Sequence, residues 1–246
     1  MARRRSGKAA VPADHWQPAI IVVVSLAPVN NTTIAADGRL TARQRRHVLL
    51  QRLLRRSHTG TGSAPEFLRR RTAMQSWPDL RAVLEDIPWA IVGGVATRAY
   101  MPERTTRDLD VLVRDADGSG VLERMEQAGF KVVSHLAIPG LLLRSPEGAE
   151  VDVLFGNQPW LEEALAHTQP DAAGYPVIAL PYLVLLKLQA ARAQDWADVS
   201  RMLGQADGDQ LEAVRAVVTQ HSPEDAEDLE ALISLGRQEM GDAPEP

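Results

Sequence analysis

The chain has 246 residues, of which 45% are hydrophobic and 24% are charged, fractions that are typical of a globular protein with one large core or two small ones. The absence of cysteine excludes disulfides, thiolate zinc sites and catalytic thiols, and it suits a reducing cytoplasm. Residues 1–75 carry 14 Lys and Arg against 3 Asp and Glu, and the remainder carries 13 against 29. This asymmetry indicates a basic leader joined to an acidic body.

Residues 1–75 are predicted to be this basic leader, partly disordered or poorly defined. Its apolar run at 19–27 is too short to cross a membrane as a helix, and Pro18 and Pro28 beside it disfavour a secretory signal. A basic helix is expected over 41–56, followed by a Gly/Ser/Thr linker. Clustered arginines could bind the phosphates of a nucleic acid. The alternatives are a solvated leader, or a reading frame whose natural start is Met74.

The regular part of the chain begins near Pro78. A helix is expected over 79–87, and a short apolar strand, residues 90–92, then leads into Gly93-Gly94 and a small-residue helical segment. Glycine leaves the backbone bare at this strand-to-helix turn. Exposed N–H groups and a helix N-terminus at such a turn favour phosphate.

A second apolar strand is predicted over 108–113. Alternation places Leu109, Val111 and Val113 towards the core, and Asp108 and Asp110 together on the opposite face. Two like charges on one face repel each other, and a divalent cation would reverse this cost because hard cations prefer carboxylate oxygens. The stretch therefore suggests a site for a metal ion and a nucleotide triphosphate.

The strand predicted over 150–155 carries a further acidic pair. Val151, Val153 and Phe155 face one way, and Glu150 and Asp152 the other. A carboxylate on such a strand is usually paired or bound to metal. Further elements complete this part of the chain. They are a turn over 115–120, a helix over 121–129 that ends on a glycine, strands over 130–133, 141–144 and 177–180, and a helix over 160–167.

Only helices are predicted after residue 180. Pro181 suits the first turn of a long helix over 182–203, and two further helices are expected over 209–220 and 223–237. On one continuous helix Asp198 would return to within about 20° of Lys187, so both could line one cleft. Asp195 is expected to pair with Arg192. The order of elements predicts an α/β (α+β) fold, with a mixed sheet flanked by helices and a helical C-terminal part.

Five features within one short window resemble the nucleotidyltransferase superfamily, whose fold is shared with DNA polymerase β. They are the Gly93-Gly94 turn after a strand and the residues Arg104, Thr106, Asp108 and Asp110. The Arg-x-Thr-x-Asp-hydrophobic-Asp pattern is similar to that of the minimal nucleotidyltransferases and of the AbiEii-type toxins of toxin–antitoxin pairs. The resemblance implies a nucleotidyltransferase core over 76–180 and a C-terminal helical region, 181–246, packed on it.

The resemblance also implies roles for single residues. Asp108, Asp110 and Asp152 would bind two Mg²⁺ ions, or Mn²⁺, and act in catalysis, with Glu150 as the rival to Asp152. The nucleotide-binding residues would be Gly93, Gly94, Arg104, Thr106 and Lys187. Other interpretations stay open: surface carboxylates without a metal, an Arg104 that only pairs with the acidic strand, and a Lys187 whose head group reaches into water.

The main hypothesis is a cytoplasmic, Mg²⁺-dependent enzyme that moves an NMP from an NTP to an acceptor hydroxyl. The resemblance implies an acceptor that is RNA, such as tRNA, or a partner protein, and a toxin with an antitoxin partner. The alternative is a catalytically inactive module of the same fold that binds nucleotide or RNA. A complete set of three carboxylates favours the enzyme. No membrane association is expected.

Overall fold

The computed structural model describes residues 47, 50, 77–101 and 108–240, all within one compact unit, Leu40–Pro246. Apart from residues 47 and 50, the predicted leader with its linker and Met74 lies outside the described residues, and so do Arg104 and Thr106. Of the helix expected over 41–56, His47 and Leu50 are described. Both are helical, and Leu50 is buried in the core.

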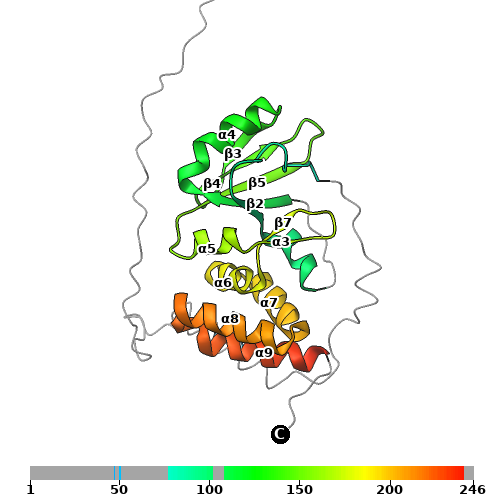
Figure 1. The fold of residues 1–246 in the computed structure, drawn as a ribbon. Coiled ribbons are helices and arrows are strands. Elements are labelled where there is room, and N and C mark those ends of the chain that lie inside the picture. The colour runs from blue at the N-terminus through cyan, green and yellow to red at the C-terminus, as the bar shows by residue number, and fades with distance from the viewer. Residues whose placement is uncertain (1–46, 48–49, 51–76, 102–107, 241–246) are drawn as a thin grey trace, which may run out of the picture. The chain divides into compact units, whose positions relative to one another are not determined.

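The described part of the chain forms a seven-stranded mixed sheet in the order β3-β4-β5-β2-β1-β7-β6 (Figure 1). β2 pairs in parallel with β5, and β1 with β7, while the other neighbours are antiparallel. The strands are β1 (Trp89–Ile91), β2 (Asp108–Arg114), β3 (Lys131–His135), β4 (Gly140–Arg144), β5 (Glu150–Gly156), β6 (Gln169–Pro170) and β7 (Pro176–Val177).

Helices lie on both faces of this sheet. The α-helices are α3 (Gly93–Ala96), α4 (Gly118–Gln127), α5 (Leu161–Ala166), α6 (Leu180–Ala190), α7 (Ala193–Gln205), α8 (Gly208–His221) and α9 (Ala226–Met240). Short 3-10 turns, Thr97–Ala99, Asp115–Asp117 and Pro223–Asp225, adjoin α3, α4 and α9. Figure 1 shows α4 on one side of the sheet and α5 and α6 on the other, with α8 and α9 further from the sheet than α6.

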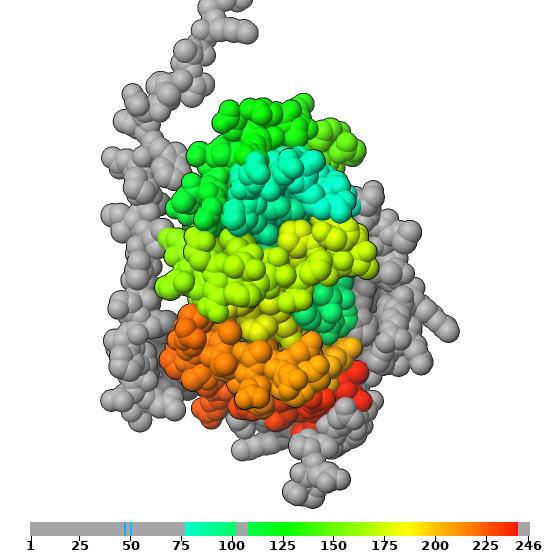
Figure 2. All heavy atoms as spheres, viewed as in Figure 1, coloured from blue at the N-terminus to red at the C-terminus, as the bar shows by residue number. Residues whose placement is uncertain are grey.

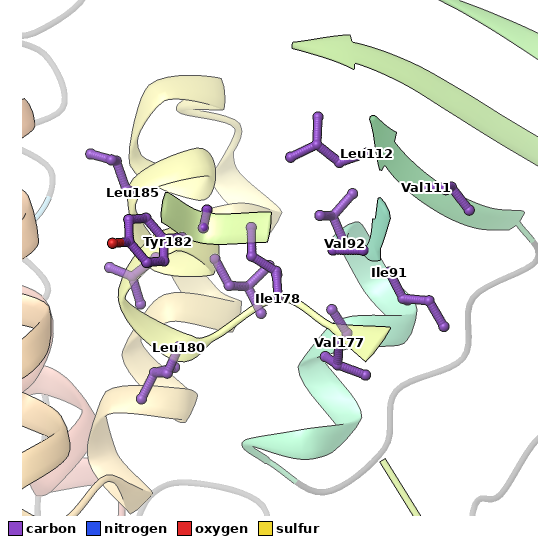
Figure 3. Packing of buried hydrophobic residues seen from close by; sticks show 14 of the residues in the cluster. Ile91, Val92, Val111, Leu112, Val177, Ile178, Leu180, Tyr182 and Leu185 are labelled. Carbon is purple, nitrogen blue, oxygen red and sulfur yellow. The ribbon is translucent and has the colours of Figure 1, made fainter. Parts of the chain in front are cut away.

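The central strands bury both of their faces. Leu109, Val111 and Val113 are all buried, as the alternation predicts. Figure 3 shows Leu112 and Val111 projecting to opposite sides of β2, with Leu112 directed towards α6. Asp108 and Asp110 therefore lie on the same face of β2 as Leu112. Helix α6 covers this face at Leu112, further along the strand.

The predicted fold class is confirmed, since a mixed sheet is flanked by helices and followed by helices alone. The helix expected over 79–87 is wrong: residues 81–86 form turns, although Leu80 and Leu84 are buried as an amphipathic helix would bury them. Figure 2 shows this segment in cyan beside the green surface that includes α4, to which Asp86 is joined by an ion pair with Arg124.

The single helix expected over 182–203 is also wrong. It is two helices, α6 and α7, because Ala191 adopts a left-handed conformation with φ of 53° and Arg192 is extended. The strand predicted over 177–180 ends at Val177, and α6 begins at Leu180, with Pro181 in its first turn as expected. The turn expected over 115–120 already contains the start of α4.

Within the described ranges, no helix combines the length and the apolar character that crossing a membrane requires.

Candidate active site

Three carboxylates converge at the beginnings of β2 and β5. The two strands run in parallel with Asp110 opposite Asp152 and Asp108 opposite Glu150. Each of Asp108, Asp110 and Asp152 offers a carboxylate oxygen, and these oxygens lie within 4.8 Å of one another. All three residues are half-buried. The sheet thus brings together the three residues that the sequence singled out as metal ligands.

Glu150, the rival to Asp152, lies beside this cluster but is engaged elsewhere. Its Oε1 accepts a hydrogen bond of 2.9 Å from Nη2 of Arg144 on the neighbouring strand β4. Its side chain is 44% exposed. Glu150 therefore adds negative charge near the cluster and is itself neutralised by Arg144.

The diglycine turn makes room for Asp110. Gly93 has a φ of 62°, which favours glycine, and a Cβ atom there would lie only 1.9 Å from Oδ2 of Asp110. The backbone N–H of Gly94 donates to the same oxygen over 3.4 Å, and the N–H of Val92 donates to the Asp110 carbonyl. Gly93 and Gly94 thus position a carboxylate of the cluster, a role that the sequence interpretation, which assigned them to phosphate, did not include.

The cluster has the electrostatics of a cation site. Burial, together with the charges of Asp108 and Asp152, raises the pKa of Asp110 to about 7. Burial and the charges of Asp108 and Glu150 also raise the pKa of Asp152. A bound cation would remove both the repulsion and the desolvation cost. Three converging carboxylates are a donor set that fits Mg²⁺ or Mn²⁺.

Lys187 lies in α6 and is buried, with 4% of its surface exposed. Its Nζ donates to Oδ1 of Asp195 over 3.1 Å and to Oδ2 of Asp198 over 2.8 Å. Its head group is therefore not in water. Its charge nevertheless acts on the carboxylate cluster, because it lowers the pKa of Asp110.

Arg192 stands at the corner between α6 and α7. Its Nε donates to Oδ2 of Asp195 over 2.7 Å, which confirms the expected pair. Burial would raise the pKa of Asp195, but the hydrogen bonds from Arg192 and Lys187 outweigh it and lower that pKa. The hydrogen bond to Asp195 is also the main reason why the pKa of Arg192 is raised, and the charges of Asp110 and Asp108 add to it.

Arg192 thus lies within electrostatic range of the three-carboxylate cluster. Sequence reasoning gave it a structural role only. The signal that was available is its position between Lys187 and the two aspartates Asp195 and Asp198, an order of residues similar to that of the nucleotidyltransferases named above.

No protein-family model matches the sequence, and the curated proteins contain no match to it. Among solved structures, the chain is similar to the antibiotic-resistance factor ANT(2'')-Ia, at 19% identity over 62% of this chain and 85% of that one, with a TM-score of 0.37. It is similar to the lincosamide antibiotic adenylyltransferase LnuA, at 14% identity over 56% of this chain and 90% of that one, with a TM-score of 0.33.

A third similarity is to the Cid1 poly(U) polymerase, at 18% identity over 64% of this chain and 44% of that one, with a TM-score of 0.26.

Proposed function

We propose that the protein is a Mg²⁺-dependent nucleotidyltransferase that moves an NMP from an NTP to an acceptor hydroxyl. The observation that carries this proposal is the convergence of Asp108, Asp110 and Asp152 on two parallel strands beside a diglycine turn. This arrangement combines a cation site with bare backbone at the point where a nucleotide would have to approach.

In this reaction the acceptor oxygen forms a bond to the α-phosphorus of the NTP. The bond between that phosphorus and the oxygen of the β-phosphate breaks, and pyrophosphate leaves with the electron pair. Asp152, whose raised pKa suits a proton acceptor, takes the proton of the attacking hydroxyl. Mg²⁺ held by the three aspartates would neutralise charge on the attacking and leaving oxygens.

The nucleotide would lie against the diglycine turn. Gly93 and Gly94 are proposed to approach it with their backbone, and Arg104 and Thr106, which precede β2 in the sequence, are proposed to complete the contacts to the phosphates. Lys187 contributes a buried positive charge close to Asp110. Residues 76–180 would form the catalytic core, with the helical region 181–246 packed on it.

The acceptor is proposed to be an RNA such as tRNA, or a partner protein. The excess of arginine in residues 1–75 favours RNA, because clustered positive charge binds phosphates. A toxin that acts in the cytoplasm and is held by an antitoxin partner is the biological setting that the sequence motif suggests.

The test is a transfer assay on the full chain. Purified protein, Mg²⁺ and each of the four NTPs labelled at the α-phosphate are incubated with bulk RNA and, separately, with cell protein. Label is expected on one acceptor class, and Asp108→Asn or Asp110→Asn should remove it.

The matched control is Glu150→Gln. This carboxylate lies on the same face of β5 as Asp152 but is paired with Arg144, so its loss should leave transfer close to that of the wild type. If no NTP labels either acceptor class while the protein still binds NTP, the inactive binding module is the better description. Equal loss in Glu150→Gln and Asp110→Asn would contradict the assignment of the three ligands.

A further inference from the structure

Lys187 is the cation that the sequence resemblance places against the nucleotide, but its surroundings do not suit direct contact. The side chain is only 5% exposed, and two of its three N–H donors are used by Asp195 and Asp198. The remaining donor is buried with the side chain, and a phosphate that displaced Asp195 or Asp198 to reach Nζ would break a buried ion pair, which is costly. The phosphate contact therefore has to come from another cation.

Arg192 has the properties that Lys187 lacks. Its side chain is 76% exposed, and Asp195 accepts from Nε and Nη2, so an anion can approach the outer edge of the guanidinium. It also lies within electrostatic range of Asp108 and Asp110. An arginine of this kind binds phosphate with two parallel hydrogen bonds, a geometry that a lysine cannot offer.

The position of Arg192 depends on the buried residues behind it. Asp195 bonds both to Arg192 and to Lys187, and Lys187 also bonds to Asp198. Asp195 is 2% exposed and Asp198 is 1% exposed, so this network is fixed inside the packing between α6 and α7. The break at Ala191 places Arg192 at the corner where the two helices meet, and its guanidinium donates from there to Asp195 of the buried network.

We propose that Arg192 binds the β- and γ-phosphates of the NTP, and that Lys187 and Asp195 are positioning residues that hold its guanidinium in place. This inference rests on the proposed function. The reacting α-phosphorus has to lie at the three aspartates. Arg192 lies within electrostatic range of Asp108 and Asp110, and its exposed guanidinium can meet the β- and γ-phosphates that extend from this point. Arg192 would then neutralise the charge that develops on pyrophosphate.

The test measures binding to the full chain by calorimetry, with Mg²⁺ present. The probes are each of the four NTPs, the corresponding NMPs, and inorganic tripolyphosphate, which needs no base recognition. Arg192→Ala should weaken binding of the NTP and of tripolyphosphate by about tenfold to a hundredfold, and should leave NMP binding unchanged. The affinity of Arg192→Lys for the NTP should lie between those of the wild type and of Arg192→Ala, since lysine keeps the charge and loses the planar fork.

Two further variants separate positioning from general damage to the fold. Asp195→Asn should weaken NTP binding in the same direction as Arg192→Ala, but less, and should again spare the NMP. The matched control is Arg215→Ala. Arg215 also forms a two-point pair, with Glu230, between α8 and α9, and its loss should not change binding of any probe.

The outcomes distinguish this inference from the function on which it rests. If the wild type binds an NTP and Arg192→Ala binds it equally well, Arg192 has been assigned wrongly and the transferase proposal stands. Equal weakening of NTP and NMP would also overturn the assignment to the β- and γ-phosphates. If the wild type binds neither an NTP nor tripolyphosphate and transfers no label, both proposals are wrong.

Discussion

Asp110 of β2 and Asp152 of β5 are direct partners in a parallel pair of strands, and their side chains lie on one face of the sheet. Two carboxylates in this relationship repel each other unless a proton or a cation lies between them. The pKa of Asp110, raised to about 7, shows that the metal-free site favours the proton near neutral pH. A divalent cation would replace that proton.

Magnesium is therefore expected to stabilise the folded protein. Adding Mg²⁺ should raise the midpoint of thermal unfolding, and a chelator should reverse the effect. At an ion concentration of one hundred times the dissociation constant the gain is about 2.7 kcal/mol. Asp110→Asn and Asp152→Asn should lose most of this gain and Glu150→Gln should keep it. A gain of the same size in all three variants would place the ion elsewhere.

The stability of the metal-free protein should fall as the pH rises from about 4 to 7. An unfolded aspartate loses its proton near pH 3.8, whereas native Asp110 keeps it to about pH 7. Between these values the native state binds more protons, so the free energy of unfolding decreases with pH and levels off above about 7. The raised pKa of Asp152 acts in the same direction.

Urea denaturation in the presence of a chelator, at pH 5 and pH 8, measures this effect. The wild type should lose on the order of 2–4 kcal/mol between the two conditions. Asp110→Asn, which cannot ionise, should lose less and should be the more stable of the two at pH 8. A wild type that gains stability over this range, relative to the variant, would contradict the raised pKa.

Gly93→Ala should damage both the fold and the ion site. The left-handed conformation costs an alanine about 1–2 kcal/mol, and the added methyl group would overlap Oδ2 of Asp110. Chemical denaturation and Mg²⁺ titration should both show a loss. Gly120→Ala, within α4 and with no atom within 4 Å of the added carbon, should instead gain up to about 1 kcal/mol. Unchanged Mg²⁺ affinity in Gly93→Ala would show that Asp110 can move without consequence.

Lys187→Met should destabilise the protein by about 3–5 kcal/mol, because it removes the buried cation that Asp195 and Asp198 share. Combining it with Asp195→Asn and Asp198→Asn should recover part of this loss, since less negative charge is then buried without that cation. Urea denaturation of the single, double and triple variants measures the coupling. A triple variant no more stable than Lys187→Met would show that packing of the lysine stem, and not its charge, matters.

The carboxylate cluster could be predicted from sequence because alternation along a strand is a local property. Asp108, Asp110 and Asp152 each follow the pattern of apolar residues around them, and the parallel pairing of β2 and β5 places them together. The contact between Gly93 and Asp110 could not be predicted in the same way. It depends on how closely the turn approaches β2, which no residue pattern encodes.

The break between α6 and α7 was not predictable from residue preferences. Residues 189–194 contain neither glycine nor proline, and alanine favours a continuous helix. The burial of Lys187 followed from the same break, because α7 folds back beside α6 and brings Asp195 and Asp198 to Nζ. The expectation that Lys187 and Asp198 approach each other was met, but through a turn of the backbone and not along one helical face.

Ala191 connects these two helices in a conformation that glycine adopts with less strain. Removal of its methyl group would relax the backbone at this point, and the same change would let the chain sample more shapes beside Arg192. Replacing Ala191 by glycine is therefore expected to ease the strain at this turn and to loosen the hold on the guanidinium that we propose for phosphate binding.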